Sequence, residues 1–479
     1  MRRSVGAAVL LSILAATPSF SAGVSARRAQ PVQVAAAESV VPAASGPAAA
    51  LDVVIASDVH AAQANDMTRL VFDLSASVAP RAFVLADPNR LIIDLPEVNF
   101  QIDPSAGRSA VDTAKKPVGK AAARNLPKGK PVEAASVKPL AGVISSFRFG
   151  RFAAGKSRVV IELAEPARIV RIESEDGKDG QGARLVLDLA RTDIASFALS
   201  AAEGARLSLK PREEEKLAAT VPAGNDVRPV VVIDPGHGGI DVGAHGASST
   251  LEKTIVFDFA KSLAARLKAS DRYRVVMTRD EDIFVSLSER VKIARSAGAA
   301  LFVSIHADTL SDAASVSGAT VYTVSDKASD AEAARVAENE NMADAAGGLD
   351  GVDDVTDVSD ILFDLTRRET RAYSHVFART LIGYIKEHAR LNKNPQRAAG
   401  FRVLKAPDVP SVLLELGYLS SERDLTQLRS LEWREKTAAS VSRAVDEFFA
   451  GRLPGLPTGR AVATDVPAPP DSGVARVIH

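Results

Sequence analysis

Two patterns of hydrophobic and polar positions divide the chain. From residue 51 to about 191, short runs in which apolar and polar residues alternate predict β-strands. From residue 229 to about 453, apolar strand-like runs alternate with segments of helical periodicity. The first pattern is typical of a β-sandwich, and the second of a mostly parallel twisted sheet flanked by helices. We therefore predict an all-β domain followed by an α/β domain.

The β-rich region repeats itself. A unit of strand, turn, strand, turn, strand occurs twice, in three matching pairs of segments: 69–74 with 158–163, 80–84 with 166–170, and 90–95 with 184–189. Such a repeat predicts a two-sheet sandwich. We interpret its alternating Arg and Asp residues as the solvated face of each strand. Its one histidine, His60, has no acidic cluster or glycine loop around it, so we interpret residues 51–191 as a binding or targeting module.

The α/β region contains well-separated strand and helix segments. The expected strands are residues 230–233, 273–278, 300–305, 318–324, 401–404 and 411–416. The expected helices are residues 251–267, 286–297, 331–346, 369–388 and 433–449. Alternation of this kind predicts a wound sheet whose strands share one carboxyl edge.

The remaining segments have the composition of signals, linkers and tails. Residues 1–26 combine a basic start, a short apolar run and small residues, which is typical of an export signal, by a route that the sequence leaves open between Sec and Tat. No later segment is long and apolar enough to span a bilayer. We expect a flexible lead-in at 27–50, a disordered insert at 104–138, a linker with one helical turn at 192–228, and a disordered tail at 454–479.

Composition restricts the possible chemistry. The 479 residues include 59 Lys plus Arg and 59 Asp plus Glu, so there is no basic excess to indicate a nucleic acid as a partner. The chain has no cysteine, which excludes disulfides, thiol catalysis and cysteine-ligated zinc. Any metal must therefore be held by histidines, of which there are seven, and by carboxylates.

Three side chains form a candidate metal site. His237 follows the strand 230–233 within a glycine-rich loop, His306 follows the strand 300–305, and Glu252 lies at the start of the first helix. Taken singly, each has a structural explanation: a loop histidine, a histidine at a strand end, or an acid beside a helix dipole. Parallel strands and the following helix bring all three to one edge of the sheet. Two imidazoles, one carboxylate and an open fourth position form the ligand set of a catalytic zinc site.

Glu415 is the candidate catalytic residue. It lies at the end of the apolar strand 411–416, where burying a carboxylate is costly unless it has a partner or a function. A structural alternative is an ion pair with an arginine such as Arg402. If its strand adjoins the strand before His306, Glu415 can take a proton from the attacking water and pass it to the leaving nitrogen.

These motifs carry a resemblance to a known family. DPGHGG at 234–239, EK at 252–253, SIHAD at 304–308 and PSVLLELG at 410–417 resemble, in this order, the catalytic domain of zinc-dependent N-acetylmuramoyl-L-alanine amidases. The resemblance implies Zn²⁺ on His237, Glu252 and His306, with Glu415 catalytic. It also implies a periplasmic enzyme that hydrolyses the amide between N-acetylmuramic acid and L-alanine of peptidoglycan. The β-rich repeat resembles the AMIN domain, which localises such enzymes to the envelope.

The long interruption after His306 suggests regulation. Residues 331–346 are acidic and strongly helical, and in one interpretation they form an ordinary surface helix. Division amidases of the resembled type carry an insertion here, about 325–366 in this chain, whose helix covers the zinc until an envelope activator displaces it. Glu338 and Glu340 are the two carboxylates that could block the metal, and the sequence does not decide between them.

Two other functions remain open from the sequence. A zinc peptidase that cleaves within the peptidoglycan stem peptide would use the same metal chemistry. A non-catalytic wall-binding protein would need the sandwich and linkers but not the candidate metal ligands together with Glu415.

Overall fold

The computed structural model describes residues 53–108, 140–177, 182–208, 226–247, 250–309, 316–349 and 361–450. The expected export signal, the lead-in and the C-terminal tail lie outside the described residues, as do most of the insert and about half of the linker. Among the described helices, none is long and apolar enough to cross a membrane.

The N-terminal described region is all β apart from one short 3₁₀ turn and one helix. Its strands are β1 (Val54–Ala64), β2 (Met67–Leu74), β3 (Arg81–Leu85), β4 (Arg90–Pro96), β5 (Val98–Phe100), β6 (Ile144–Ala153), β7 (Lys156–Leu163), β8 (Ala167–Asp176) and β9 (Ala183–Arg191). They form a five-stranded sheet of order β5-β1-β2-β9-β8 and a four-stranded sheet of order β3-β4-β7-β6. Apolar side chains of both sheets, such as Phe72 and Ile161, share one core. The prediction of an all-β sandwich is confirmed.

The two copies of the repeat are interleaved between the sheets. β2 of the first copy pairs with β9 of the second, and β4 of the first pairs with β7 of the second. The arginines and aspartates that we interpreted as a solvated face form ion pairs across these junctions. Arg69 Nε lies 2.7 Å from Asp188, and Arg158 Nε lies 2.6 Å from Asp94. That interpretation was wrong for Asp188 and Arg158, which are buried.

A second correction concerns the segment expected to be a linker. Residues 194–208 form the helix α2 (Ile194–Ser208) rather than one helical turn. Phe197 and Ala201, four residues apart on one face, are buried in the core of the sandwich. Packing against the β-sheet therefore stabilises a helix that we did not predict from the sequence.

The C-terminal described region is an α/β domain. Its elements are β10 (Val230–Pro235), α3 (Glu252–Ala269), β11 (Arg274–Met277), α4 (Leu287–Ser296), β12 (Ala299–His306), β13 (Ala319–Val324), α5 (Ala331–Asn341), α6 (Ala343–Ala346), α7 (Ile361–Ile385), β14 (Leu391–Ala399), η2 (Arg402–Leu404), β15 (Ser411–Glu415), α8 (Glu422–Leu428) and α9 (Leu431–Ala450). The sheet order is β11-β10-β12-β15-β13-β14, and of these neighbouring pairs only β13 with β15 is antiparallel. The prediction of a mostly parallel sheet flanked by helices is confirmed.

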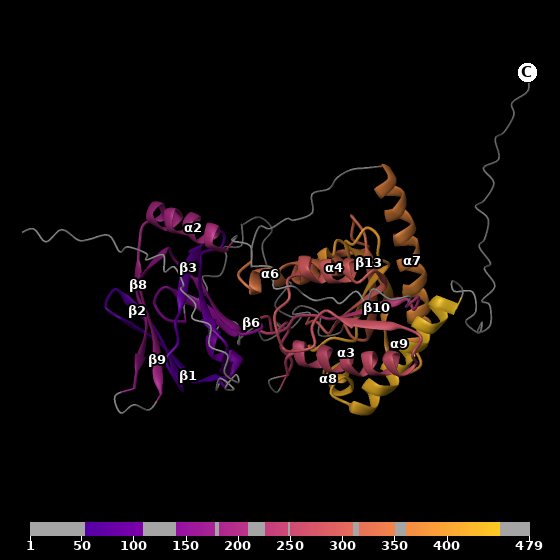
Figure 1. Ribbon diagram of the computed structural model, residues 1–479, viewed down its shortest axis with the longest axis horizontal. Helices are drawn as coiled ribbons and strands as arrows, with labels where there is room; N and C mark the ends of the chain where they lie inside the picture. The colour runs from indigo at the N-terminus through magenta and orange to yellow at the C-terminus, as the bar shows by residue number, and fades with distance from the viewer. Residues whose placement is uncertain are drawn as a thin grey trace, which may run out of the picture. The chain divides into compact units, whose positions relative to one another are not determined.

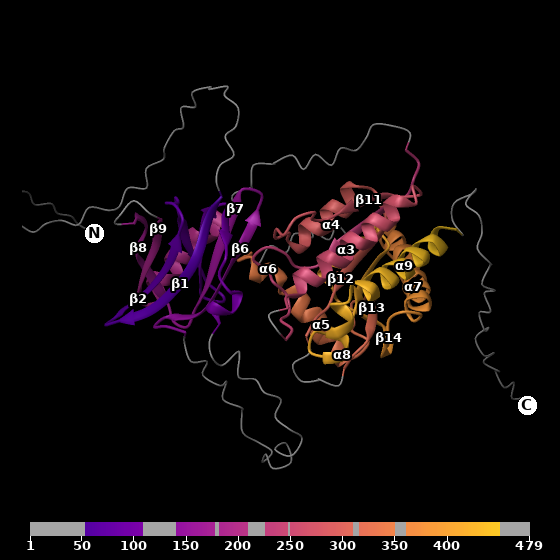
Figure 2. The same cartoon turned by 90° about the horizontal axis from the view of Figure 1, so that it is seen from below.

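Helices cover both faces of this sheet, as Figure 1 shows for α3 and α4. One face packs against α3, α7 and α9 through side chains such as Phe259, Phe377 and Val441. The other packs against α4 and α5 through Leu287, Val336 and Tyr322. Figure 2 shows α3 and α9 side by side on the first face. Because the sheet is covered on both faces, the sequences of β10 and β12 are continuous apolar runs rather than alternating patterns.

Residues 401–404 were predicted as a strand, but Arg402–Leu404 form the 3₁₀ helix η2 and Phe401 precedes it. Val403 and Leu404 are buried, and a short apolar run cannot be assigned to strand or helix by periodicity alone. The strand β14, which contains Pro395, and the helix α8 were not predicted. Among the described strands β14 lies at an edge of its sheet, where a proline is tolerated.

Candidate metal centre

Neighbouring parallel strands bring the two histidines together. β10 pairs with β12 so that Pro235 lies opposite Ile305, and each strand delivers a histidine just beyond these positions. Glu252 is the first residue of α3, which begins after the loop that contains His237. The carboxyl edge of the sheet and the start of a helix therefore meet at one point, as expected for ligand sites in open α/β sheets.

Glycines make this convergence possible. A Cβ atom at Gly236 would lie 2.4 Å from the imidazole of His306. A Cβ at Gly243 would lie 2.7 Å from His237 and 2.8 Å from Glu252. His237 itself has φ of 56°, a left-handed conformation that is uncommon outside glycine and typical of functional sites. The glycine-rich sequence is thus required by how closely the loop approaches the site.

The structure brings His237, Glu252, His306 and Glu340 into one buried cluster. Glu252 Oε1 lies 3.1 Å from His237 Nε2 and 3.3 Å from His306 Nδ1. Glu340 Oε2 lies 3.0 Å from His306 Nδ1 and 3.6 Å from His237 Nε2. One ligand atom from each of the four residues lies within 4.8 Å of all the others. Their types and their spacing fit a metal ion with four protein ligands.

The hydrogen bonds leave the correct atoms available to a metal. His237 Nδ1 lies 2.8 Å from Asp241 Oδ2, so that its Nε2 faces the cluster. Both His237 Nε2 and His306 Nδ1 are buried without a hydrogen-bond partner, which is costly unless a ligand satisfies them. Glu252 is held in place because its two oxygens accept hydrogen bonds from Ala307 N and Ala244 N, each at 2.8 Å. The residues present therefore fit a bound zinc ion.

Electrostatics favour a cation at this point. Burial alone would lower the pKa of His306, but the carboxylates of Glu340 and Glu252 outweigh it and raise the pKa to about 10. Burial, together with these same two carboxylates, raises the pKa of Asp308 to about 8. Carboxylates outnumber imidazoles around the cluster, and a divalent cation would offset that excess of negative charge.

Glu415 lies beside the cluster, as the sequence predicted. It is the last residue of β15 and pairs in register with His306 on β12. Its Oε2 accepts a hydrogen bond from Asp308 N at 3.1 Å, while Oε1 has no hydrogen-bond partner. Its hydrogen bond thus comes from a backbone amide and not from the guanidinium of Arg402, the structural alternative. The side chain is fully buried, and burial raises its pKa well above the ordinary value for a glutamate.

Of the two candidate blocking residues, only Glu340 reaches the cluster. Glu340 is buried, whereas Glu338, two residues earlier on α5, is exposed. Residues two apart on a helix point in different directions, which explains the difference.

Sequence reasoning missed a buried network below the histidine loop. Asp234 accepts hydrogen bonds from Thr278 and Ser304, and Arg290 Nη1 lies 2.6 Å from it. Arg290 also donates to the carbonyl oxygens of Pro235 and His237, and Arg279 donates to those of Pro235 and Gly236. The two arginines therefore fix the backbone that carries the first histidine.

Asp241 was also missed, although the spacing of four residues from His237 was a usable signal. A carboxylate that accepts a hydrogen bond from a ligand histidine fixes its tautomer and orientation. We expect Asp241→Asn to lower the affinity of the cluster for a divalent metal ion about 10- to 100-fold, measured by competition with a chromophoric chelator. Asp282→Asn is the matched control, because Asp282 holds the same loop through Gly239 N at 2.8 Å without touching a histidine. An equal loss in both variants would contradict the orienting role of Asp241.

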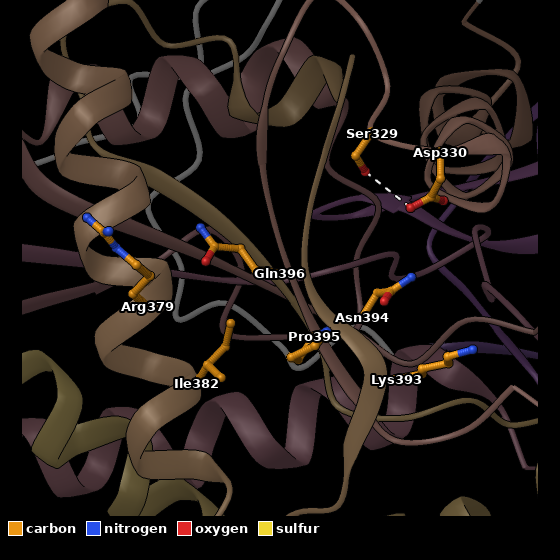
Figure 3. Close-up of a pocket in the computed structure, with 8 residues that line it drawn as sticks. All are labelled: Ser329, Asp330, Arg379, Ile382, Lys393, Asn394, Pro395 and Gln396. Atoms are coloured by element: carbon orange, nitrogen blue, oxygen red, sulfur yellow. Dashed lines mark hydrogen bonds between the residues drawn. The ribbon is translucent and has the colours of Figure 1, made fainter. Parts of the chain in front are cut away.

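A separate pocket lies between α7 and β14 (Figure 3). It is lined by Ser329, Asp330, Arg379, Ile382, Lys393, Asn394, Pro395 and Gln396, none of which belongs to the metal cluster. Its carboxylate, Asp330, caps α5 through Ala333 N at 2.9 Å and contacts Arg397 at 3.0 Å. We therefore assign this pocket no catalytic part.

Comparisons with known proteins give two family matches. The family described as N-acetylmuramoyl-L-alanine amidase matches residues 231–447, which contain every residue of the metal cluster and Glu415. The AMIN domain family matches residues 58–133, which begin in β1.

Individual relatives agree with these matches. The N-acetylmuramoyl-L-alanine amidase AmiC of Escherichia coli O6:H1 is 29% identical over 398 residues, covering 81% of this chain and 88% of that protein. The N-acetylmuramoyl-L-alanine amidase AmiA of Escherichia coli K12 is 36% identical over 221 residues, covering 46% of this chain and 76% of that protein. Among solved structures, the catalytic domain of the amidase CwlV from Bacillus (Paenibacillus) polymyxa var. colistinus is 26% identical to this chain. The match covers 46% of this chain and 98% of the CwlV chain, with a TM-score of 0.35.

Proposed function

The chain belongs to the N-acetylmuramoyl-L-alanine amidase family, and on this premise we propose that it is a zinc hydrolase whose metal is held by His237, Glu252 and His306. The observation that carries the proposal is the convergence of two buried imidazole nitrogens on Glu252 Oε1, at 3.1 and 3.3 Å, where neither nitrogen forms a hydrogen bond. The family supplies the substrate class, which is peptidoglycan, and the bond that is cut, which is the amide between N-acetylmuramic acid and L-alanine.

Glu415 is the catalytic acid and base in this proposal. When bound, zinc polarises the scissile carbonyl and lowers the pKa of the attacking water. The free Oε1 of Glu415 accepts the proton of that water, while Asp308 N holds Oε2 in place. The same oxygen then delivers the proton to the leaving nitrogen of L-alanine.

The test of the bond specificity is mass spectrometry of murein digested by the protein. Free lactyl groups together with intact stem peptides are expected. Cleavage within the peptide would instead support the zinc peptidase alternative, and intact murein bound to the protein would support a wall-binding role.

We further propose that the protein is autoinhibited. The helices α5 and α6, residues 331–346, are here called the blocking segment. They carry Glu340, whose Oε2 lies 3.0 Å from His306 Nδ1. A carboxylate at that position takes the coordination site that a catalytic metal needs for water. Substrate cannot reach the metal until this segment moves.

The contacts of the blocking segment are compatible with its displacement from the metal cluster. Asn341 donates to Gly400 O at 2.9 Å and accepts from Arg402 N at 2.7 Å. The buried apolar residues of α5 are small ones, Ala333, Val336 and Ala337. Burying such side chains contributes less than burying leucine or phenylalanine, because the stabilisation scales with apolar area. A partner that displaces the segment therefore has to replace only a small apolar contact with the sheet.

Glu340→Ala is expected to raise the activity of the isolated protein on murein about 10- to 100-fold, because a charge-assisted contact worth roughly 1.5–3 kcal/mol is lost from the blocked state only. Dye release from labelled murein measures the rate. Glu338→Ala, on the exposed side of the same helix, is the matched control and should leave the rate unchanged. An unchanged or lower rate for a folded, zinc-loaded Glu340→Ala protein would contradict autoinhibition.

Export and activation complete the proposal. The basic start and apolar run within residues 1–26 support export to the periplasm, where peptidoglycan lies. We infer that an envelope activator displaces the blocking segment during daughter-cell separation. Fractionation of cells into periplasm and cytoplasm tests the location of the protein.

A further inference from the structure

One sheet of the sandwich contacts the C-terminal end of the blocking segment. The sandwich and the α/β domain belong to one compact unit, Asp52–His479. Arg158 on β7 donates through Nη1 to Gly347 O at 2.8 Å. Arg90 on β4 donates to Ala345 O at 3.4 Å, at the end of α6, where carbonyl groups have no partner within the helix. Two guanidinium groups of the sandwich therefore bind the end of this segment.

The internal repeat of the sandwich shows that this contact belongs to one copy only. Arg158 and Arg69 are equivalent positions of the two copies, and they pair with equivalent aspartates, Asp94 and Asp188. The side chain of Arg158 is 6% exposed, whereas that of Arg69 is 51% exposed. The ion pair within the sandwich therefore does not by itself bury the arginine. Arg158 differs in that it also reaches Gly347 O of the α/β domain.

Apolar contacts surround these hydrogen bonds. Ile92 on β4 and Val160 on β7 form one buried cluster with residues of the α/β domain that include Ile240 and Phe284. A Cβ atom at Gly348, which has φ of 71°, would lie 2.6 Å from Ile92 Cδ1. The chain that follows α6 therefore approaches the sandwich so closely that the position favours glycine.

The same sheet also contacts the loop that carries the first histidine. Ile240, three residues after His237, donates through its backbone N to Arg151 O at 3.1 Å. Phe152 on β6 stacks on Phe284, with ring centroids 5.6 Å apart. The sandwich is therefore joined both to the histidine loop and to the end of the segment that covers the metal cluster.

We propose that the sandwich is a second restraint on the blocking segment, in which the sheet β3-β4-β7-β6 holds the C-terminal end of the segment beside the histidine loop. The proposal rests on the autoinhibition proposed above and adds the sandwich to it. Glu340 holds the segment at the metal cluster, and Arg158 holds its far end. A partner that draws the sandwich away from the α/β domain therefore favours opening of the site.

Arg158→Leu in the full chain tests the restraint, because it removes the donor to Gly347 O. Hydrogen exchange in residues 331–346, followed by mass spectrometry, is expected to become about 10-fold faster or more, which is the range of one hydrogen bond from a charged group. The rate of cleavage of a soluble muramoyl peptide, which does not require binding to the wall, should rise by a similar factor. Both quantities report the population in which the segment is open.

Arg69→Leu is the matched control, because it removes the equivalent arginine of the other copy and leaves Asp188 buried without it. Its cost to the sandwich is therefore at least as large, yet exchange in residues 331–346 and the cleavage rate should stay at the parental values. Phe152→Ala is a second variant for the case in which Arg158→Leu does not fold. It removes the ring that stacks on Phe284, keeps the pair of Arg158 with Asp94, and should also speed exchange in the segment.

Parental exchange in residues 331–346 of a folded Arg158→Leu or Phe152→Ala protein, or an equal increase in Arg69→Leu, would overturn the proposal. Faster exchange without faster cleavage in an active enzyme would overturn it together with autoinhibition, because the released segment would not be inhibitory. Failure of the amidase function gives a different result. No variant then cleaves the lactyl amide, while exchange in the segment still responds to Arg158→Leu and supports the restraint.

Discussion

At the proposed zinc site, Glu415→Gln is expected to keep the metal affinity of the parent and to lose about 10²- to 10⁴-fold in turnover, which is the usual contribution of a general acid or base. The substitution keeps the shape of the side chain and the acceptor for Asp308 N, while the free oxygen Oε1 can no longer take a proton. Zinc content by mass spectrometry and hydrolysis of the isolated muramoyl peptide measure the two effects. To avoid the blocking segment, the comparison is made in the Glu340→Ala protein.

For the same variant we also predict the thermal stability of the metal-free protein, which does not depend on turnover. Burial raises the pKa of Glu415 in the folded protein. Without metal, the folded state therefore binds more protons at this group than the unfolded state does from about pH 4.5 upward. Because of this difference, the contribution of Glu415 to the free energy of unfolding falls as pH rises through this range. Glutamine imitates the protonated form. The metal-free Glu415→Gln protein should therefore melt at the same temperature as the metal-free parent, or above it, at pH 7. Preserved turnover, or zinc loss in a folded variant, would contradict the assignment of Glu415.

The convergence of the candidate site could be predicted because it follows from topology. His237, His306 and Glu415 each follow or end an apolar strand, and neighbouring parallel strands end at one edge. Asp241 and Arg290 could not be assigned in this way. Their roles depend on how a loop folds back onto its own histidine, which local periodicity does not encode.

The choice between Glu338 and Glu340 was open in the sequence, although a signal for it was present. The buried positions of α5 are Ala333, Val336, Ala337 and Glu340, which are spaced by three, one and three residues. This is the spacing of one face of a helix, and Glu340 continues that face while Glu338 does not. A carboxylate in register with an apolar stripe marks a buried acid that needs a partner, which here is the metal cluster.

We did not predict β14 and α2 from the sequence, and the same physical reason applies to both. β14 is an edge strand of polar character, and α2 has a single aromatic contact residue, Phe197, among small side chains. Each contributes only one side to a core that other segments build. Their structure is decided by tertiary packing, which a reading of local pattern cannot anticipate.

His306→Ala is expected to abolish activity and to weaken zinc binding by roughly 100-fold or more, which corresponds to about 2.7 kcal/mol. The variant removes one of two imidazoles whose unpartnered nitrogens face Glu252 Oε1. Because a ligand that binds only the folded state raises its stability, zinc should raise the melting temperature of the parent more than that of the variant. Calorimetric titration of zinc into chelator-treated protein measures the affinity directly.

The matched control for this prediction is His388→Ala. His388 lies just beyond α7, and its Nδ1 is 3.0 Å from Ser440 Oγ, so its loss removes a histidine contact without touching the cluster. It should bind zinc and cleave substrate as the parent does. If His306→Ala folded normally and kept parental zinc affinity, the metal would have to lie elsewhere, and the assignment of His237 and Glu252 would fail with it. If both variants lost zinc equally, the effect of His306→Ala would reflect general destabilisation rather than the loss of a ligand.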